Sequence, residues 1–125
     1  PGLSHVEGVN VIIHSDSAID IQRLNQRAAQ IYYEAVEKGL EIKEEEAIDW
    51  FTYNAAWGLG IHEQTGSLQP GKMADLVIWS HHPFSIRAVS EMTIIDGQVM
   101  WDRDKGISGW SDFEIGQWTF DRSLE

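Results

Sequence analysis

Asp16 occupies a position at which a carboxylate could do chemistry. It follows a short apolar run, residues 9–14, and precedes an expected helix. If that run is a buried strand, Asp16 lies at its carboxyl end, where catalytic and metal-binding residues gather in parallel α/β folds. A carboxylate there can bind a divalent cation or accept a proton from a water that the cation has acidified. The alternative is that Asp16 only helps to cap the helix or fills the turn.

His14 lies two residues before Asp16, so a strand would project both side chains to the same face. A neutral imidazole is a common metal ligand. The alternative is a core histidine whose ring nitrogens are satisfied by hydrogen bonds. Spacing alone leaves both possibilities open.

One strand followed by one helix must position these two residues. Residues 9–14 are almost continuously apolar and rich in β-branched side chains, which predicts a strand buried on both faces, as in a parallel sheet. Ser17 and Asp20 match a capping box, and apolar residues then recur at three- and four-residue spacing, which predicts a helix over residues 18–38. Gly39 is expected to end this helix. The pattern indicates the α/β class.

A second helix is predicted over residues 43–57, because glutamates fill its first turn, where the helix dipole favours anions. From Asp104 onward, isolated aromatic residues without any period predict an irregular tail. Turn signals and apolar runs predict three further elements, namely a type II turn at 69–72, a strand over 74–79 and a hairpin over 93–102 that turns at Asp96-Gly97.

Composition excludes several classes of function. The 125 residues include 20 acidic and 9 basic side chains, for a net charge of -11. This balance argues against nucleic acid and anionic membranes as partners, since both need a basic surface. The lack of cysteine excludes disulfides, Cys-ligated zinc and thiol catalysis, and fits a cytoplasmic protein. No apolar run approaches the ~18–20 residues that span a bilayer.

Four stretches of the chain together resemble the metal-dependent amidohydrolase superfamily, in order and at sensible spacing. Residues 23–25 (RLN) favour its imidazolonepropionase-like branch. Residues 11–17 (VIIHSDS) are similar to the last barrel strand of the superfamily, and residues 52–60 (TYNAAWGLG) to the helix after the barrel. Residues 65–78 (TGSLQPGKMADLVI) are similar to its most recognisable C-terminal stretch, and residues 93–99 (TIIDGQV) to the hairpin that ends its small β-sandwich.

The resemblance implies a (β/α)8 barrel beside a β-sandwich, truncated in this chain. Residues 1–62 are then the end of the barrel, with its eighth strand and the helices that follow. Residues 63–103 are part of the sandwich, and residues 104–125 are an irregular tail that contains tryptophan.

The resemblance also assigns roles to residues. Asp16 is expected to be the catalytic and metal-site aspartate, which binds a divalent metal, zinc in first place, or takes the proton from the attacking water. His14 is a candidate substrate contact, as are Arg23 and Asn25 near the start of the first long helix. The alternative for Arg23 and Asn25 is that they are ordinary surface residues. The residues between Gly66 and Trp79, although familiar, are expected to be scaffold.

The resemblance predicts a complete enzyme that hydrolyses an amide or cyclic amide C–N bond in a small molecule. Family members carry a His-x-His pair on the first barrel strand and further ligands on middle strands, which a chain beginning at the eighth strand lacks. A barrel needs ~250 residues. We therefore expect this chain to be a C-terminal fragment, inactive alone, that pairs with the missing N-terminal barrel portion. In isolation it is expected to self-associate through exposed strand edges, to rearrange its first 40 residues or to be only marginally stable.

The alternative belongs to another class, a non-catalytic β-rich interaction or oligomerisation module derived from an amidohydrolase. Trp110 and Trp118 in the tail would then be its contact surface, since aromatic anchors dominate interface energetics. Metal at stoichiometric amounts would favour the enzyme, and self-association without metal would favour the module.

Overall fold

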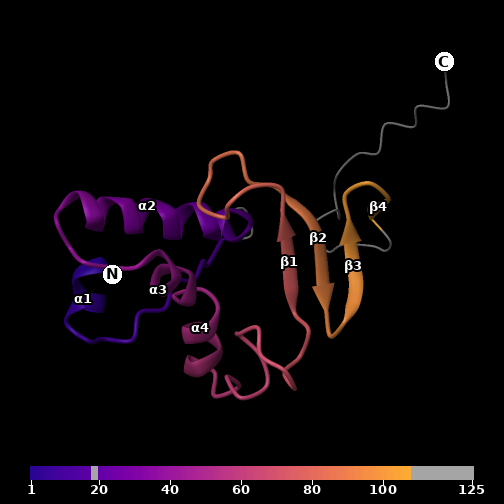
Figure 1. The fold of residues 1–125 in the computed structure, drawn as a ribbon, viewed down its shortest axis with the longest axis horizontal. Coiled ribbons are helices and arrows are strands. Elements are labelled where there is room, and N and C mark those ends of the chain that lie inside the picture. The colour runs from indigo at the N-terminus through magenta and orange to yellow at the C-terminus, as the bar shows by residue number, and fades with distance from the viewer. Residues whose placement is uncertain (18–19, 108–125) are drawn as a thin grey trace.

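A computed structural model describes residues 1–17 and 20–107 of the chain. Helices make up its first half and an antiparallel sheet its second half, and the two lie side by side with β1 nearest the helices (Figure 1). The described helices are α1 (Gly2–Val6), the 3-10 turn η1 (Asp20–Arg23), α2 (Leu24–Glu37), α3 (Glu44–Asp49) and α4 (Tyr53–Gly58); the described strands are β1 (Leu76–Trp79), β2 (Ser90–Ile95), β3 (Gln98–Asp102) and β4 (Gly106–Ile107).

The structure confirms the long amphipathic helix. It begins as η1, with the Ser17 hydroxyl accepting a hydrogen bond from the backbone N–H of Asp20 (3.3 Å), and continues as α2. Three alanines on one face of α2 are buried. Gly39 adopts the left-handed conformation (φ +81) and donates its N–H to the Val36 carbonyl (2.9 Å), which ends the helix as predicted.

The second predicted helix, over residues 43–57, is wrong as a single element, because the chain breaks it into α3 and α4. Trp50, between the two, is completely buried, and Thr52 leaves the helical conformation (φ -121, ψ -93). Trp50 itself is still helical (φ -58, ψ -27), so the chain changes direction at Thr52, directly after the buried indole. The glutamate-rich start of α3 is confirmed, and the backbone N–H of Lys43 donates to the Glu46 carboxylate (2.8 Å).

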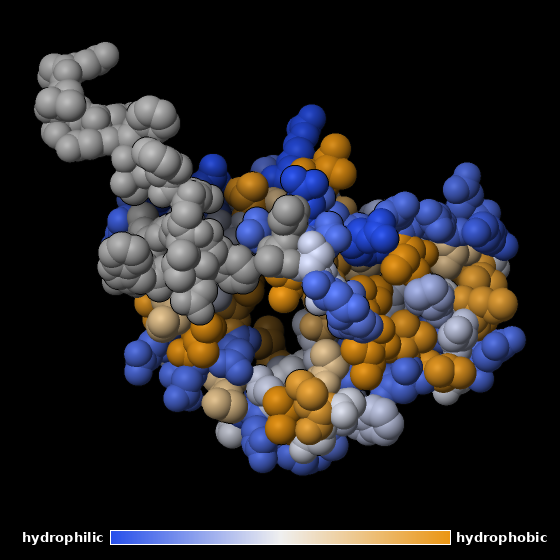
Figure 2. All heavy atoms as spheres, turned by 180° about the vertical axis from the view of Figure 1, so that it is seen from behind, coloured by the Kyte–Doolittle hydropathy of each residue, from blue (hydrophilic) through white to orange (hydrophobic). Residues whose placement is uncertain are grey.

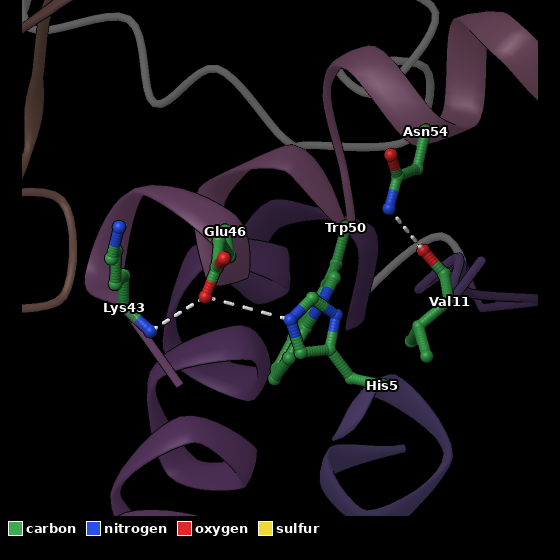
Figure 3. Close-up of polar contacts among 6 residues, drawn as sticks. All are labelled: His5, Val11, Lys43, Glu46, Trp50 and Asn54. Atoms are coloured by element: carbon green, nitrogen blue, oxygen red, sulfur yellow. Dashed lines mark hydrogen bonds and ion pairs between the residues drawn. The ribbon is translucent and has the colours of Figure 1, made fainter. Parts of the chain in front are cut away.

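Trp50 is the largest fully buried side chain, and the helical core forms around it. Its indole N–H donates to Nδ1 of His5 (3.3 Å), whose Nε2 lies 3.6 Å from the Glu46 carboxylate (Figure 3). The backbone N–H of Lys43, together with the nearby His5, holds the pKa of Glu46 below its ordinary value. This chain of contacts fastens α1, which the sequence did not predict, to α3.

The predicted strand over residues 9–14 is wrong. This segment has no strand assignment and joins no ladder with any described residue. Instead, Val11 is buried in the helical core, and the backbone N–H of Ile13 donates to the Trp50 carbonyl (2.9 Å). A strand needs a neighbouring strand, and every strand in the described residues belongs to the sheet formed from Leu76 onward. The apolar run is therefore core-forming but irregular.

The sheet has the order β1-β2-β3-β4 and is antiparallel throughout. The predicted hairpin is confirmed, because Asp96 (φ 48) and Gly97 (φ 75) both adopt the positive φ of a type I′ turn. The predicted strand over 74–79 is observed as β1. The tail is not irregular from Asp104, because β4 pairs with β3; residues 108–125, including Trp110 and Trp118, lie outside the described residues.

The mixture of helices and strands fits an α/β class. A (β/α)8 barrel and a sandwich remain predictions, as do the boundaries 1–62, 63–103 and 104–125. None of the helices in the described part of the chain is long and apolar enough to cross a bilayer.

Candidate active site

The irregular segment 9–16 carries the candidate chemistry, and two hydrogen bonds to its backbone, at Val11 and Ile13, attach it to the helices. The side-chain amide of Asn54, in the first turn of α4, donates to the Val11 carbonyl (2.9 Å), as Figure 3 shows. The N–H of Ile13 donates to the Trp50 carbonyl (2.9 Å). Residues 11 and 13 are thereby fixed to the α3–α4 junction, and the chain beyond them leads directly to His14 and Asp16.

His14 and Asp16 meet at the end of this segment. Nδ1 of His14 lies 3.4 Å from a carboxylate oxygen of Asp16, so the two-residue spacing brings them together although the strand is absent. The side chains are 74% and 95% exposed, respectively. An exposed carboxylate beside an imidazole can accept and return a proton, and both groups are accessible to a ligand from outside the chain.

Arg23 and Asn25 are placed differently. Arg23 is exposed at the end of η1. Asn25 is buried, and its side-chain amide donates to the Pro83 carbonyl (2.7 Å) in the loop after β1. In this structure Asn25 therefore joins α2 to that loop, and a role in substrate binding remains a prediction for both residues.

Segment 9–16 could supply some, but not all, of the ligands of a metal ion. Among the described residues, no three His, Asp or Glu side chains gather around one point. The His14–Asp16 pair offers one imidazole nitrogen and one carboxylate, both of which suit zinc, whereas catalytic zinc sites use three protein ligands. The pair fits as a contribution to a metal site that needs further ligands.

A cavity of about 820 Å³ separates the helices from the sheet. Figure 2 shows it as a hollow bordered by hydrophobic side chains. Of the four predicted site residues, Asn25 lines it and the other three do not. Its walls are mostly apolar and include Ile21, Phe51, Leu59, Leu68, Val77 and Trp79.

The loop between α4 and β1 has the contacts of a scaffold. A Cβ on Gly66 (φ +87) would lie 2.6 Å from the Cβ of Ala56 in α4, so the loop backbone packs directly on that helix. Asp75 accepts hydrogen bonds from the backbone N–H of Asp96 (2.9 Å) and from the Thr65 hydroxyl (2.8 Å). These two donors hold the pKa of Asp75 below its usual range. The carboxylate ties the loop to the hairpin turn.

Sequence reasoning missed Asn54 as a residue that supports the site. Asparagine has low helix propensity because its amide competes for backbone groups. An asparagine between Tyr53 and Ala55, inside a predicted helix, was therefore a signal that its side chain bonds elsewhere. That signal could not identify Val11 as the partner.

The model of the Amidohydrolase family matches residues 3–100 of this chain. An imidazolonepropionase from Thermoplasma volcanium is 36% identical over an alignment that covers 78% of this chain and 25% of that protein. Urease subunit alpha from Haloquadratum walsbyi is 49% identical over 37 residues, which are 30% of this chain and 6% of the urease subunit.

Among solved structures, an amidohydrolase from Thermotoga maritima is similar with a TM-score of 0.66 and 35% identity, over 79% of this chain and 24% of that chain. This chain thus spans about a quarter of the length of the imidazolonepropionase and of the Thermotoga structure. With the family model matched over residues 3–100, this chain belongs to the amidohydrolase family.

Proposed function

We propose that this chain is the C-terminal part of a metal-dependent hydrolase that cleaves amide or cyclic amide C–N bonds, and that Asp16 carries the proton transfers. The observation that supports this role most directly is the exposed His14–Asp16 pair, held at the end of an anchored segment in a member of this family. The similarity to an imidazolonepropionase favours the cyclic amide as substrate class.

Asp16 would act twice in one turnover. A carboxylate oxygen takes the proton of the water whose oxygen attacks the carbonyl carbon, and then returns it to the nitrogen as the C–N bond breaks. His14, 3.4 Å away, orients the carboxylate by contact with one oxygen and leaves the other for the water. A divalent cation, zinc in first place, would acidify the water and polarise the carbonyl, with ligands shared between this pair and the remainder of the protein. Arg23, exposed, is a candidate contact for the substrate.

The remainder of the protein also accounts for the cavity between helices and sheet. A monomer rarely exposes a large apolar surface without a partner. The three quarters of the relatives' length that this chain does not match would supply the segments that cover it.

An interaction module remains the second candidate, since the same apolar cavity could receive another protein. The net charge of -11 opposes a second copy of the chain as that partner. Metal at stoichiometric amounts in the complete protein would support the hydrolase. A metal-free complex with another protein, together with no hydrolysis of amide substrates, would support the module.

The decisive experiment compares Asp16→Asn with Asp20→Asn in the complete protein. Both substitutions remove one exposed carboxylate, and they lie four residues apart. General acid–base catalysis contributes roughly 10²–10⁴ in rate, so Asp16→Asn should lower kcat by about that factor on cyclic amides, while Asp20→Asn should leave it near wild type. Equal kcat values in the two variants would refute the role of Asp16.

A further inference from the structure

We propose that Asn54 is a positioning residue for Asp16, acting through the backbone of residues 11–13. The inference rests on the proposed function and deepens it, because it identifies what holds the His14–Asp16 pair in place. Asn54 touches neither residue of the pair. Its side-chain amide donates to the Val11 carbonyl, five residues before Asp16 (Figure 3).

The segment needs anchors because it lacks the ladder that would hold a strand. Residues 9–16 are irregular, so their course depends on individual contacts. Among the described residues, two hydrogen bonds fix its backbone between residues 11 and 13: Asn54 to the Val11 carbonyl, and the Ile13 N–H to the Trp50 carbonyl, each 2.9 Å. The Val9 N–H is bonded farther back, to the Ser4 carbonyl (3.0 Å), so loss of the Asn54 bond would leave the Ile13 N–H as the one remaining backbone anchor among the described contacts between Val9 and Asp16.

Both anchors belong to a rigid part of the helical layer. Trp50 is fully buried, and Ala56, one half-turn after Asn54, is buried against the loop backbone at Gly66. Asparagine has a short side chain with only two torsions, so its amide cannot move far from the backbone of α4. The position of the Val11 carbonyl is therefore tied to the position of α4.

The distance from the anchors to Asp16 magnifies any pivot. Asp16 is three residues beyond Ile13, a reach of up to about 10 Å at 3.3–3.6 Å per residue. A rotation of roughly 10° about Ile13 would displace Asp16 by about 2 Å over that reach. A misplacement of about 1 Å can cost about 10² in rate. Loss of one distant hydrogen bond is thus sufficient to impair catalysis without any change in the catalytic groups.

Asn54→Asp tests the anchor with nearly the same shape. At neutral pH the carboxylate has no donor and faces the Val11 carbonyl; when protonated, it regains an O–H donor. Thr52→Val is the matched control, because it removes a hydrogen bond from the same turn, Thr52 hydroxyl to Ile48 carbonyl (2.9 Å), that does not reach residues 9–16. If Asn54→Asp does not fold at neutral pH, Asn54→Ala removes the donor without adding charge.

Amide hydrogen exchange of the 125-residue chain is the first measurement. In Asn54→Asp at pH 7 we expect the amide of Ile13 to exchange at least ten times faster than in wild type, with Ala28 and Ala47 in the core changed no more than in Thr52→Val. The ratio to wild type at Ile13 should return toward one as the pH is lowered through the pKa of the new carboxyl. An unchanged Ile13 amide, or an effect independent of pH, would overturn the anchor.

Kinetics of the complete protein is the second measurement. We expect Asn54→Asp at neutral pH to lower kcat by ten-fold or more with KM nearly unchanged, and Thr52→Val to change neither. If Asp16→Asn abolishes activity and Asn54→Asp leaves kcat intact, the positioning role fails and the proposed function stands. If Ile13 exchanges faster in Asn54→Asp but Asp16→Asn retains full kcat, the proposed function fails, and with it the catalytic purpose of the anchor.

Discussion

Gly66 gives the sharpest test of how the loop between α4 and β1 is held. Gly66 and Gly71 belong to the same loop, and both have positive φ, +87 and +92, so alanine suffers the same backbone strain at either position. They differ in their surroundings. A Cβ at position 66 would lie 2.6 Å from the Cβ of Ala56 and 3.2 Å from the Thr52 carbonyl oxygen, whereas a Cβ at position 71 meets nothing within 4 Å.

The free-energy difference between the two variants follows from these contacts. The left-handed conformation costs an alanine about 1–2 kcal/mol. The smaller entropy of the unfolded chain returns about 0.4–1 kcal/mol. Both effects are common to Gly66→Ala and Gly71→Ala. Forcing one methyl group against a packed helix adds about 1–3 kcal/mol, and this applies only to Gly66→Ala.

Urea unfolding followed by circular dichroism measures the difference. With a slope of about 1–3 kcal/mol per molar urea, Gly66→Ala should unfold at roughly 1 M lower urea than Gly71→Ala. Equal midpoints with equal slopes would refute the reasoning, because they would mean that the loop does not pack on α4 as the 2.6 Å approach requires.

Two further predictions concern single polar groups. The Lys43 backbone N–H lowers the pKa of Glu46 in the folded chain, so the unfolded chain binds protons more readily at this carboxyl. The resulting contribution to the free energy of unfolding is fully present above the ordinary pKa of 4.5 and is lost as the pH falls through the lower pKa of the folded chain. The unfolding midpoint of Glu46→Gln should therefore lie below that of wild type at pH 7 and approach it near pH 3; a gap that widens in acid would contradict this sign. Asn25→Ala removes the amide that donates to the Pro83 carbonyl at 2.7 Å, and it should lower the free energy of unfolding by about 1–3 kcal/mol. Thermal denaturation measures this loss, and an unchanged melting temperature would contradict it by showing that water replaces the amide.

The elements predicted correctly are those that short-range physics determines. The stripe of α2 and the left-handed Gly39 that ends it depend on residues within one or two turns of each other. The hairpin depends on Asp96 and Gly97, which alone supply the two positive φ values of its turn.

Two of the three wrong predictions involve the same residue, the buried Trp50. Its indole reaches His5, 45 residues away in sequence, and its carbonyl accepts the N–H of Ile13. Trp50 lies where the helix predicted over 43–57 divides into α3 and α4, and its carbonyl takes the place of the strand partner expected for residues 9–14. A β-branched apolar run indicates burial, but it cannot specify whether its backbone bonds to a strand or to a helix junction.

The proximity of His14 and Asp16 could be predicted from the sequence, whereas the contact that supports their segment could not. His14 and Asp16 are two positions apart, and this spacing brings them together whether the backbone is paired or merely extended. Their anchor at Asn54 depends on a contact between residues 43 positions apart, which no local pattern encodes.

Two charged side chains of the loop after α4, those of Lys72 and Asp75, are engaged in contacts that hold the loop. The Lys72 ammonium donates to the Ser67 hydroxyl (2.7 Å) and to the His62 carbonyl, and Asp75 accepts from Thr65 and Asp96. To act on a substrate, either residue would have to break the contacts that hold the loop. Asp16 and His14 are exposed and contact each other, so they can take part in chemistry without unfolding anything.

Scaffold and candidate site nevertheless meet in one short helix. Gly66 of the loop packs on Ala56 of α4. Asn54 of the same helix binds the Val11 carbonyl in the segment that leads to Asp16. Ala56 and Asn54 are two residues apart in a six-residue helix, which is too short to absorb a displacement at one position without moving the other. We therefore expect strain introduced in the loop to displace the segment that leads to Asp16.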